Sequence, residues 1–142
     1  MRFMVFVKNV PEAEGGKLPD KEAFEAMGRF NLEMANAGMV LAADGLQPTS
    51  KGARISFSGG KPSVTDGPFT ESKELVAGFW IIQAKSKEDA IAWMSRAPFE
   101  ECQLEIRPVF EPADFPAEVA NPERRGELDT LIDRANAERS SA

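Results

Sequence analysis

Two short stretches of this sequence are apolar on both alternating sides, and they limit the folds that the chain can adopt. Phe3–Val7 and Leu75–Ala84 are rich in Val, Ile and aromatic residues and are far shorter than a membrane span, so we expect both to be strands. A strand with one face in water alternates between apolar and polar residues. Because these two strands do not alternate, both faces of their sheet need to be covered.

The remaining elements follow from periodicity and end signals. One helix is expected to begin near Asp20 and to end before Gly38, and a second to begin at the capping box that opens with Ser86 and to stop at Pro98. The first helix is expected to bury one apolar stripe: Ala23, Phe24, Met27, Phe30, Met34 and Ala37. Further strands are expected at three places: Met39–Ala43, Leu104–Phe110 and a hairpin of Arg54–Ser58 and Ser63–Thr65 around Gly59-Gly60.

This order predicts an α+β fold of the ferredoxin-like β-α-β-β-α-β type with a hairpin insertion, spanning residues 1–110. Both helices would lie on one face of the antiparallel sheet, so we expect a second copy of the chain to cover the other face, giving a homodimer. Residues 111–142 form a Pro-rich and charged extension with one amphipathic helix from Asn121-Pro122 through Leu128–Ala135. This helix could dock weakly on its own domain or reach a partner subunit.

Composition excludes several classes of function. The 142 residues contain no histidine and no tyrosine, so no imidazole base or histidine-ligated metal is available, and we expect neither a transition metal nor a cofactor. The net charge of −6 argues against nucleic-acid and anionic membrane partners. The single cysteine, Cys102, allows no intrachain disulfide, and we expect a cytoplasmic protein.

Several short motifs resemble the DGPF branch of the YCII-related (YciI-like) family over Arg2–Phe110. The most specific is Asp66–Phe69 (DGPF), and Gly45–Pro48 and Glu105–Pro108 also fit the pattern. The resemblance implies a dimeric α+β barrel of ferredoxin-like subunits. Some relatives resemble enzymes with a His-Asp pair in a cleft, and some DGPF relatives occur beside or fused to sigma factors. Here Met27 stands near the position of the family's histidine, so that mechanism does not carry over.

Asp66–Phe69 can be interpreted as a structural corner or as the rim of a site. In the structural interpretation, which we prefer, the Asp66 carboxylate bonds to the backbone of its own turn and Phe69 anchors the corner, so that loss of Asp66 would damage folding. In the functional interpretation, the polar residues that follow Phe69 line the mouth of a cleft.

The other candidate site residues are polar or aromatic groups near the ends of strands. Asp44, Asp66 and Glu74 are the candidates for a catalytic carboxylate. The candidate ligand-binding residues are Gln47, Arg54, Asp66, Lys73 and Trp80. Arg54 and Lys73 would meet an anionic group or pair with neighbouring carboxylates, and Trp80 would form a pocket wall or belong to the core.

Three functions remain open at this point. The first is a small dimeric domain, free of cofactors, that binds a small molecule or serves as an accessory module. The second is a lyase or isomerase that removes a proton with a buried carboxylate and stabilises the anion with Arg54 or Lys73. The third is an interaction module that regulates a transcription-related protein, for which the amphipathic Leu128–Ala135 segment is the indication.

Overall fold

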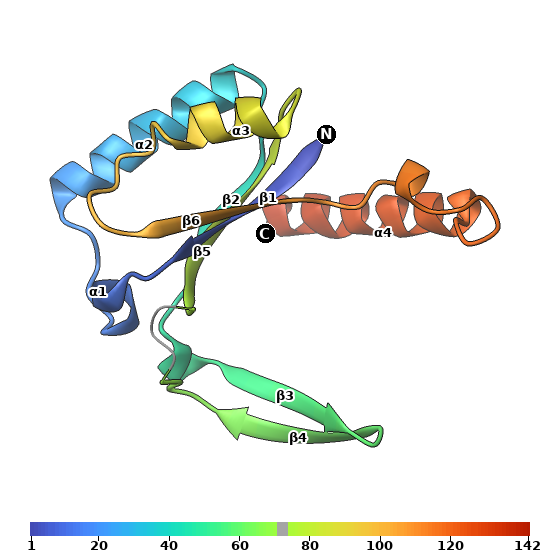
Figure 1. The fold of residues 1–142 in the computed structure, drawn as a ribbon, viewed down its shortest axis with the longest axis horizontal. Coiled ribbons are helices and arrows are strands. Elements are labelled where there is room, and N and C mark those ends of the chain that lie inside the picture. Colours follow the sequence, from blue (N-terminus) through green and yellow to red (C-terminus); the bar gives the residue numbers. More distant parts are fainter. Residues whose placement is uncertain (71–73) are drawn as a thin grey trace. The chain divides into compact units, whose positions relative to one another are not determined.

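The computed structural model describes residues 1–70 and 74–142. The chain divides into two compact units, Met1–Val109 and Phe110–Ala142, which we describe separately (Figure 1). In the first unit the strands β1 (Arg2–Lys8), β2 (Val40–Gly45), β5 (Val76–Gln83) and β6 (Gln103–Pro108) form an antiparallel sheet in the order β2-β5-β1-β6. This order is that of a ferredoxin-like sheet, so the predicted α+β fold class is confirmed.

Two helices cover one face of this sheet (Figure 1). Helix α2 (Lys21–Asn36) is capped by Asp20, and helix α3 (Lys87–Met94) by Ser86, as the sequence predicts. Two details of the expectation are wrong. The apolar stripe of α2 begins later than predicted because Phe24 is exposed, and α3 ends at Met94, before Pro98 is reached.

The core lies between these helices and the sheet. Val5 pairs with Trp80 and Ile106 on neighbouring strands, and cross-strand partners share a face. Phe30 and Met34 of α2 pack onto this face together with Ala90 and Met94 of α3. The buried side chains of the sheet that they meet are Phe3, Val5, Val7, Trp80 and Ile82.

The opposite face of the sheet, here called the open face, carries side chains of the other parity. One row across the strands runs Asp44, Phe79, Phe6 and Glu105, and the next runs Ala42, Ile81, Met4 and Arg107. The four central residues of these rows, Met4, Phe6, Phe79 and Ile81, are only half-buried in the single chain. Neither α2 nor α3 covers them, because both helices pack on the other face.

Strands β3 (Ala53–Ser58) and β4 (Lys61–Asp66) form a separate two-stranded sheet joined at Gly59-Gly60 (Figure 1). Both glycines have positive φ, 59° and 78°, which only glycine adopts readily in a tight turn. Every residue of the two strands is exposed. The predicted hairpin is therefore present, and it is longer by one residue at the start of β3 and by several in β4.

Two short helices in the first unit lie in segments that were expected to be loops. Helix α1 (Pro11–Glu14) follows β1, and the 3₁₀ helix η1 (Thr49–Lys51) precedes the hairpin. In the second unit, the 3₁₀ helix η2 (Pro112–Asp114) is followed by helix α4 (Pro122–Ser141), which Asn121 caps. None of the described helices is both long enough and apolar enough to span a bilayer.

Candidate functional site

The turn at Asp66–Phe69 is fastened to the rest of the first unit by a hydroxyl group. The Thr49 hydroxyl donates to Glu14 Oε1 and accepts from the backbone N–H of Phe69 at 3.0 Å. The backbone N–H of Thr49 also donates to Glu14 Oε2 at 3.2 Å, and that of Gly67 donates to the carbonyl of Gly52 at 3.0 Å. The Glu14–Thr49–Phe69 network thus ties α1 and η1 to the root of the hairpin.

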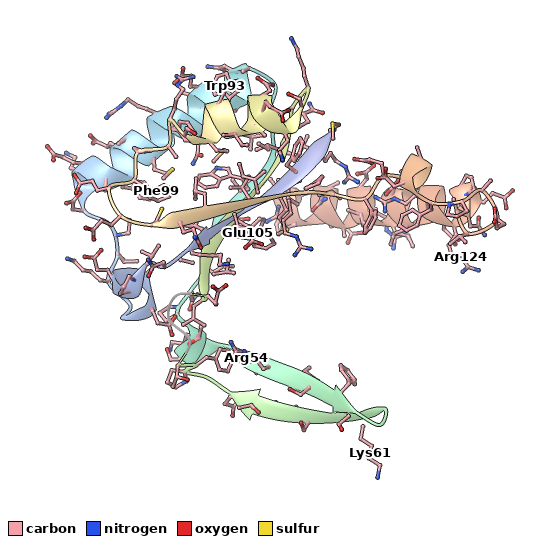
Figure 2. The ribbon with its side chains drawn as sticks, in the orientation of Figure 1. Arg54, Lys61, Trp93, Phe99, Glu105 and Arg124 are labelled. Carbon is pink, nitrogen blue, oxygen red and sulfur yellow. The ribbon has the colours of Figure 1, made fainter. Side chains whose placement is uncertain are left out.

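Asp66 does not perform the capping role expected from the sequence. It lies at the exposed end of β4, opposite Ala53, and among the described residues its carboxylate has no hydrogen-bond partner. The capping is instead supplied by Thr49, which precedes the hairpin and approaches the turn from outside it. Arg54 lies at the root of the hairpin with its guanidinium 3.8 Å from the centre of the Phe69 ring (Figure 2).

A second polar cluster surrounds Lys8, the last residue of β1. Its ammonium lies 2.7 Å from Glu74 Oε2 and donates to Glu105 Oε1 at 3.0 Å. Lys8 is only 8% exposed, whereas the Glu74 side chain is mostly in water. The hydrogen bonds to Glu74 and Glu105 raise the pKa of Lys8, and burial opposes them.

This Lys8–Glu74–Glu105 cluster borders the aromatic centre of the open face. Glu105, labelled on β6 in Figure 2, stands directly opposite Phe6 in the ladder, and Phe6 stands opposite Phe79. Asp44 ends the same row on β2 and is exposed. The row therefore presents two aromatic rings between two carboxylates, with a cation at the Glu105 end.

Two hollows lie among the described residues, one very small and one very open. Beside the Lys8 end of the sheet, Glu14, Gln47 and Leu75 line a cavity of about 10 Å³, room for about one water molecule. An open hollow of about 500 Å³ at the other end is lined by Met1, Gln83 and Trp93 among others, and includes none of the predicted site residues. Neither encloses a substrate-sized volume.

The remaining predicted site residues are scattered. Gln47 lies at the small cavity, whereas Trp80 is 4% exposed in the core. The Trp80 indole N–H donates to Asn31 Oδ1 at 2.8 Å, and its ring meets Phe30 and Phe99 edge to face. Lys73 lies outside the described residues. Of the other predicted residues that the structure describes, Arg54 and Asp66 lie at the hairpin root, and Asp44, Gln47 and Glu74 lie toward the Lys8 end of the sheet.

Sequence reasoning missed the residues that organise both groups. The sequence pattern places Lys8 just after the first strand, Glu105 inside the last strand, and Glu14 and Thr49 in loops. The signal for Lys8 was a charged residue at the end of an apolar strand, because such a residue needs ionic partners once the sheet buries it. For Thr49, no local signal exists, because its partners lie 35 residues before it and 20 residues after it.

The carboxylates and the single thiol are the remaining groups that could bind a metal ion or act as a nucleophile. Within residues 1–70 and 74–142, no group of three or more Cys, Asp or Glu side chains is placed to hold a metal ion. Cys102 is half-buried, and burial raises the pKa of its thiol, which disfavours the nucleophilic thiolate.

The fold and these polar clusters define a small α+β domain with one open sheet face. The chain belongs to the YCII-related domain family, whose model matches residues 1–113.

The chain is similar to an uncharacterized protein and to a solved enzyme structure. It is 28% identical over 106 residues to the uncharacterized protein R00369 of Rhizobium meliloti (strain 1021), covering 71% of this chain and 86% of the relative. A solved structure of 5-chloro-2-hydroxyhydroquinone dehydrochlorinase from Burkholderia phenoliruptrix AC1100, in complex with 2,5-dihydroxybenzoquinone, matches with a TM-score of 0.41 and 14% identity. That match covers 80% of this chain and 98% of the other.

Proposed function

We propose that this chain, as a member of the DGPF branch of its family, is a homodimeric domain that binds a small molecule without a cofactor. In this proposal a second copy covers the open face and encloses a site at the Lys8–Glu74–Glu105 cluster. The observation that carries the proposal is Lys8, a lysine 8% exposed between two carboxylates at the border of an uncovered apolar sheet face. A cytoplasmic location accords with a half-buried free thiol.

The small size of the cavity beside the cluster supports a site that a second copy completes. A ligand site normally encloses several hundred Å³, while the cavity next to the cluster holds about 10 Å³. The half-buried Met4, Phe6, Phe79 and Ile81 form a contiguous apolar surface in the middle of the open face. Covering this surface with a second copy would remove it from water and would add walls around the cluster.

The chemistry of the cluster indicates the class of ligand. Lys8 occupies one oxygen of each carboxylate, and the remaining lone pairs of Glu74 and Glu105 can accept hydrogen bonds from hydroxyl or amino groups. Phe6 and Phe79 offer ring faces or edges next to Glu105. The arrangement suits a small aromatic compound that carries hydroxyl or amino substituents.

A lyase or isomerase reaction at the same place is the second form of this proposal. It requires a carboxylate shielded from water, but Asp44, Asp66 and Glu74 are all exposed in the single chain. Of these, Asp44 and Glu74 lie where a second copy over the open face could shield them. Glu74 would then be the candidate base, with Lys8 as the cation that stabilises a developing anion.

The test combines sedimentation with ligand binding. We expect the wild type to sediment as a dimer at micromolar concentration, and a panel of phenols, catechols and aromatic amines to include compounds that raise its melting temperature. Glu105→Gln and Lys8→Met should weaken binding of those compounds at least tenfold. Glu88→Gln, an exposed carboxylate on helix α3, serves as the control and should bind normally. A monomer, or binding that the cluster variants do not affect, would refute the proposal.

A second candidate function is that of an interaction module. Helix α4 carries Leu128, Leu131 and Ile132 about half-exposed at helical spacing, and such a stripe suits a hydrophobic groove on another protein. The sigma-factor association that the DGPF resemblance implies points to a transcription-related partner. Replacing Leu128 and Leu131 by Ser should abolish recovery of such a partner while leaving dimer and ligand binding unchanged.

A further inference from the structure

We infer that the β3–β4 hairpin is a dimerisation arm whose apolar face packs against the second copy. This inference rests on the proposed homodimer and extends it from the open sheet face to the hairpin. The hairpin is amphipathic across its two faces. Ile55 pairs with Val64 and Phe57 with Pro62 on one face, while Arg54–Thr65, Ser56–Ser63 and Ser58–Lys61 are the pairs of the other.

The apolar face of the hairpin is unusually exposed for residues of this size. Ile55, Phe57 and Val64 are 60%, 74% and 66% exposed. These side chains are neighbours on the same face of the hairpin, so they form one continuous apolar strip. A two-stranded hairpin on its own is at best marginally stable in water, so this strip is expected to be covered in the working protein.

The root of the hairpin is held firmly enough for it to act as an arm. The Glu14–Thr49–Phe69 network and the bond from Gly67 N–H to the Gly52 carbonyl fasten both strands at the same place. Gly67 is packed so closely against Thr49 that an added Cβ would collide with the Thr49 backbone. In Figure 2 Arg54 marks this root and Lys61 the tip.

The apolar area of the open face and the hairpin together favours a second copy as the occupant. Taking ~200 Å² for a large side chain, the half-buried Met4, Phe6, Phe79 and Ile81 expose no more than about 300 Å² together. A standard interface buries ~800 Å² on each partner, so this face alone is too small. The hairpin strip contributes roughly 400 Å² on the same basis, which brings the apolar total close to that requirement.

The contact is expected to use the face of the hairpin and not its edges. Pro62 lies within β4 and has no N–H to offer, so continued strand pairing along β4 is interrupted. Lys61 at the tip adds a charge that opposes edge-to-edge association. Covering this face would also remove the aggregation hazard that a side chain as exposed as Phe57 creates.

A photo-cross-linking pair gives the direct test. A benzoylphenylalanine group introduced at Phe57 on the apolar face is compared with one at Ser56 on the polar face. We expect irradiation of the Phe57 variant to give a species of twice the 15.5 kDa chain mass, and the Ser56 variant to give little of it. A Phe57 cross-link within one chain, for example to residues 110–142, would overturn the inference in favour of the chain's own second unit.

A set of polar substitutions gives the complementary test. Ile55→Ser, Phe57→Ser and Val64→Ser combined should raise the dissociation constant of the dimer at least a hundredfold, while Ser56→Ala with Ser63→Ala should leave it within threefold. The circular-dichroism spectrum reports whether the four-stranded sheet remains folded. A wild-type dimer that the triple substitution leaves intact would overturn the hairpin inference alone. A wild type that is monomeric at micromolar concentration would overturn the proposed function as well.

Discussion

The four-stranded sheet and the β3–β4 hairpin are built from similar residues and differ in what covers them. Ile82 of β5 is fully buried between the sheet and its helices, whereas Ile55 of β3 is 60% exposed. Both positions lie in strands with apolar neighbours on the same face. Residue type therefore determines that each segment is a strand, and the helices determine which strand becomes core.

The largest expected effect compares these two isoleucines directly. Ile82→Ala should lower the free energy of unfolding by about 2–5 kcal/mol, because it leaves a cavity among packed side chains. Ile55→Ala should change the stability of the isolated chain by no more than about 0.5 kcal/mol, because its side chain lies in water. Urea denaturation of both variants measures this difference.

The same two variants can be compared again at several protein concentrations. If a second copy covers the hairpin, the cost of Ile55→Ala should grow as the wild-type dimer becomes populated, since association stabilises only the folded chain. Most of the loss of unfolding free energy in Ile82→Ala should be the same at every protein concentration. Equal costs for the two variants in dilute solution would mean that the hairpin is packed within its own chain.

A second comparison concerns two glycines, one at the hairpin root and one in a helix. Gly67→Ala should destabilise the fold by about 1–3 kcal/mol, because the new Cβ meets the backbone of Thr49, which the Glu14–Thr49–Phe69 network holds in place. Gly28 lies inside α2 with open space around it, so Gly28→Ala should stabilise by about 0.5–1 kcal/mol. Thermal denaturation should show melting temperatures that move in opposite directions.

The sheet and its helices could be predicted because their signals are local. The caps Asp20 and Ser86 each bond to a backbone N–H three residues later, and the apolar runs of β1 and β5 are continuous. The order of these elements then indicated the ferredoxin-like sheet. The end of α3 at Met94 was not predicted, because no residue between Met94 and Pro98 marks the end of a helix. The exposure of Phe24 was not predicted either, because the spacing of apolar residues shows which face of a helix is apolar but not how much of that face the sheet covers.

The candidate site was predicted less well because its contacts are distant in sequence. Glu74 was named from the sequence, but its partner Lys8 is 66 residues away, and Lys8 reaches Glu105 across 97 residues. Asp66 was chosen for its turn propensity, which is a local property, yet Thr49 supplies the bond at this corner. Propensity identified the turn, and the tertiary fold decided which side chain fastens it.

The smallest expected effect compares Thr49 with Asp66, and it revises the interpretation that the sequence favoured. Thr49→Val keeps the shape of the side chain but removes the hydroxyl that accepts from Phe69 N–H and donates to Glu14. Phe69 N–H and Glu14 Oε1 then lose a partner, but both contacts are only part-buried and water can replace them, so we expect Thr49→Val to destabilise the fold by about 1 kcal/mol. Asp66→Ala removes an exposed carboxylate and should cost less than about 0.5 kcal/mol.

Melting temperatures of Thr49→Val, Asp66→Ala and wild type decide this order, with Thr49→Ser as the matched control that retains the hydroxyl. Thr49→Ser should recover most of the stability, because only a methyl group is lost and both hydrogen bonds can form. If Asp66→Ala melts several degrees below wild type while Thr49→Val does not, the corner depends on the turn carboxylate after all. If neither variant changes the melting temperature, the root of the hairpin is held by the packing of Gly67 and by the Arg54–Phe69 contact. Phe69→Ala should then displace the hairpin.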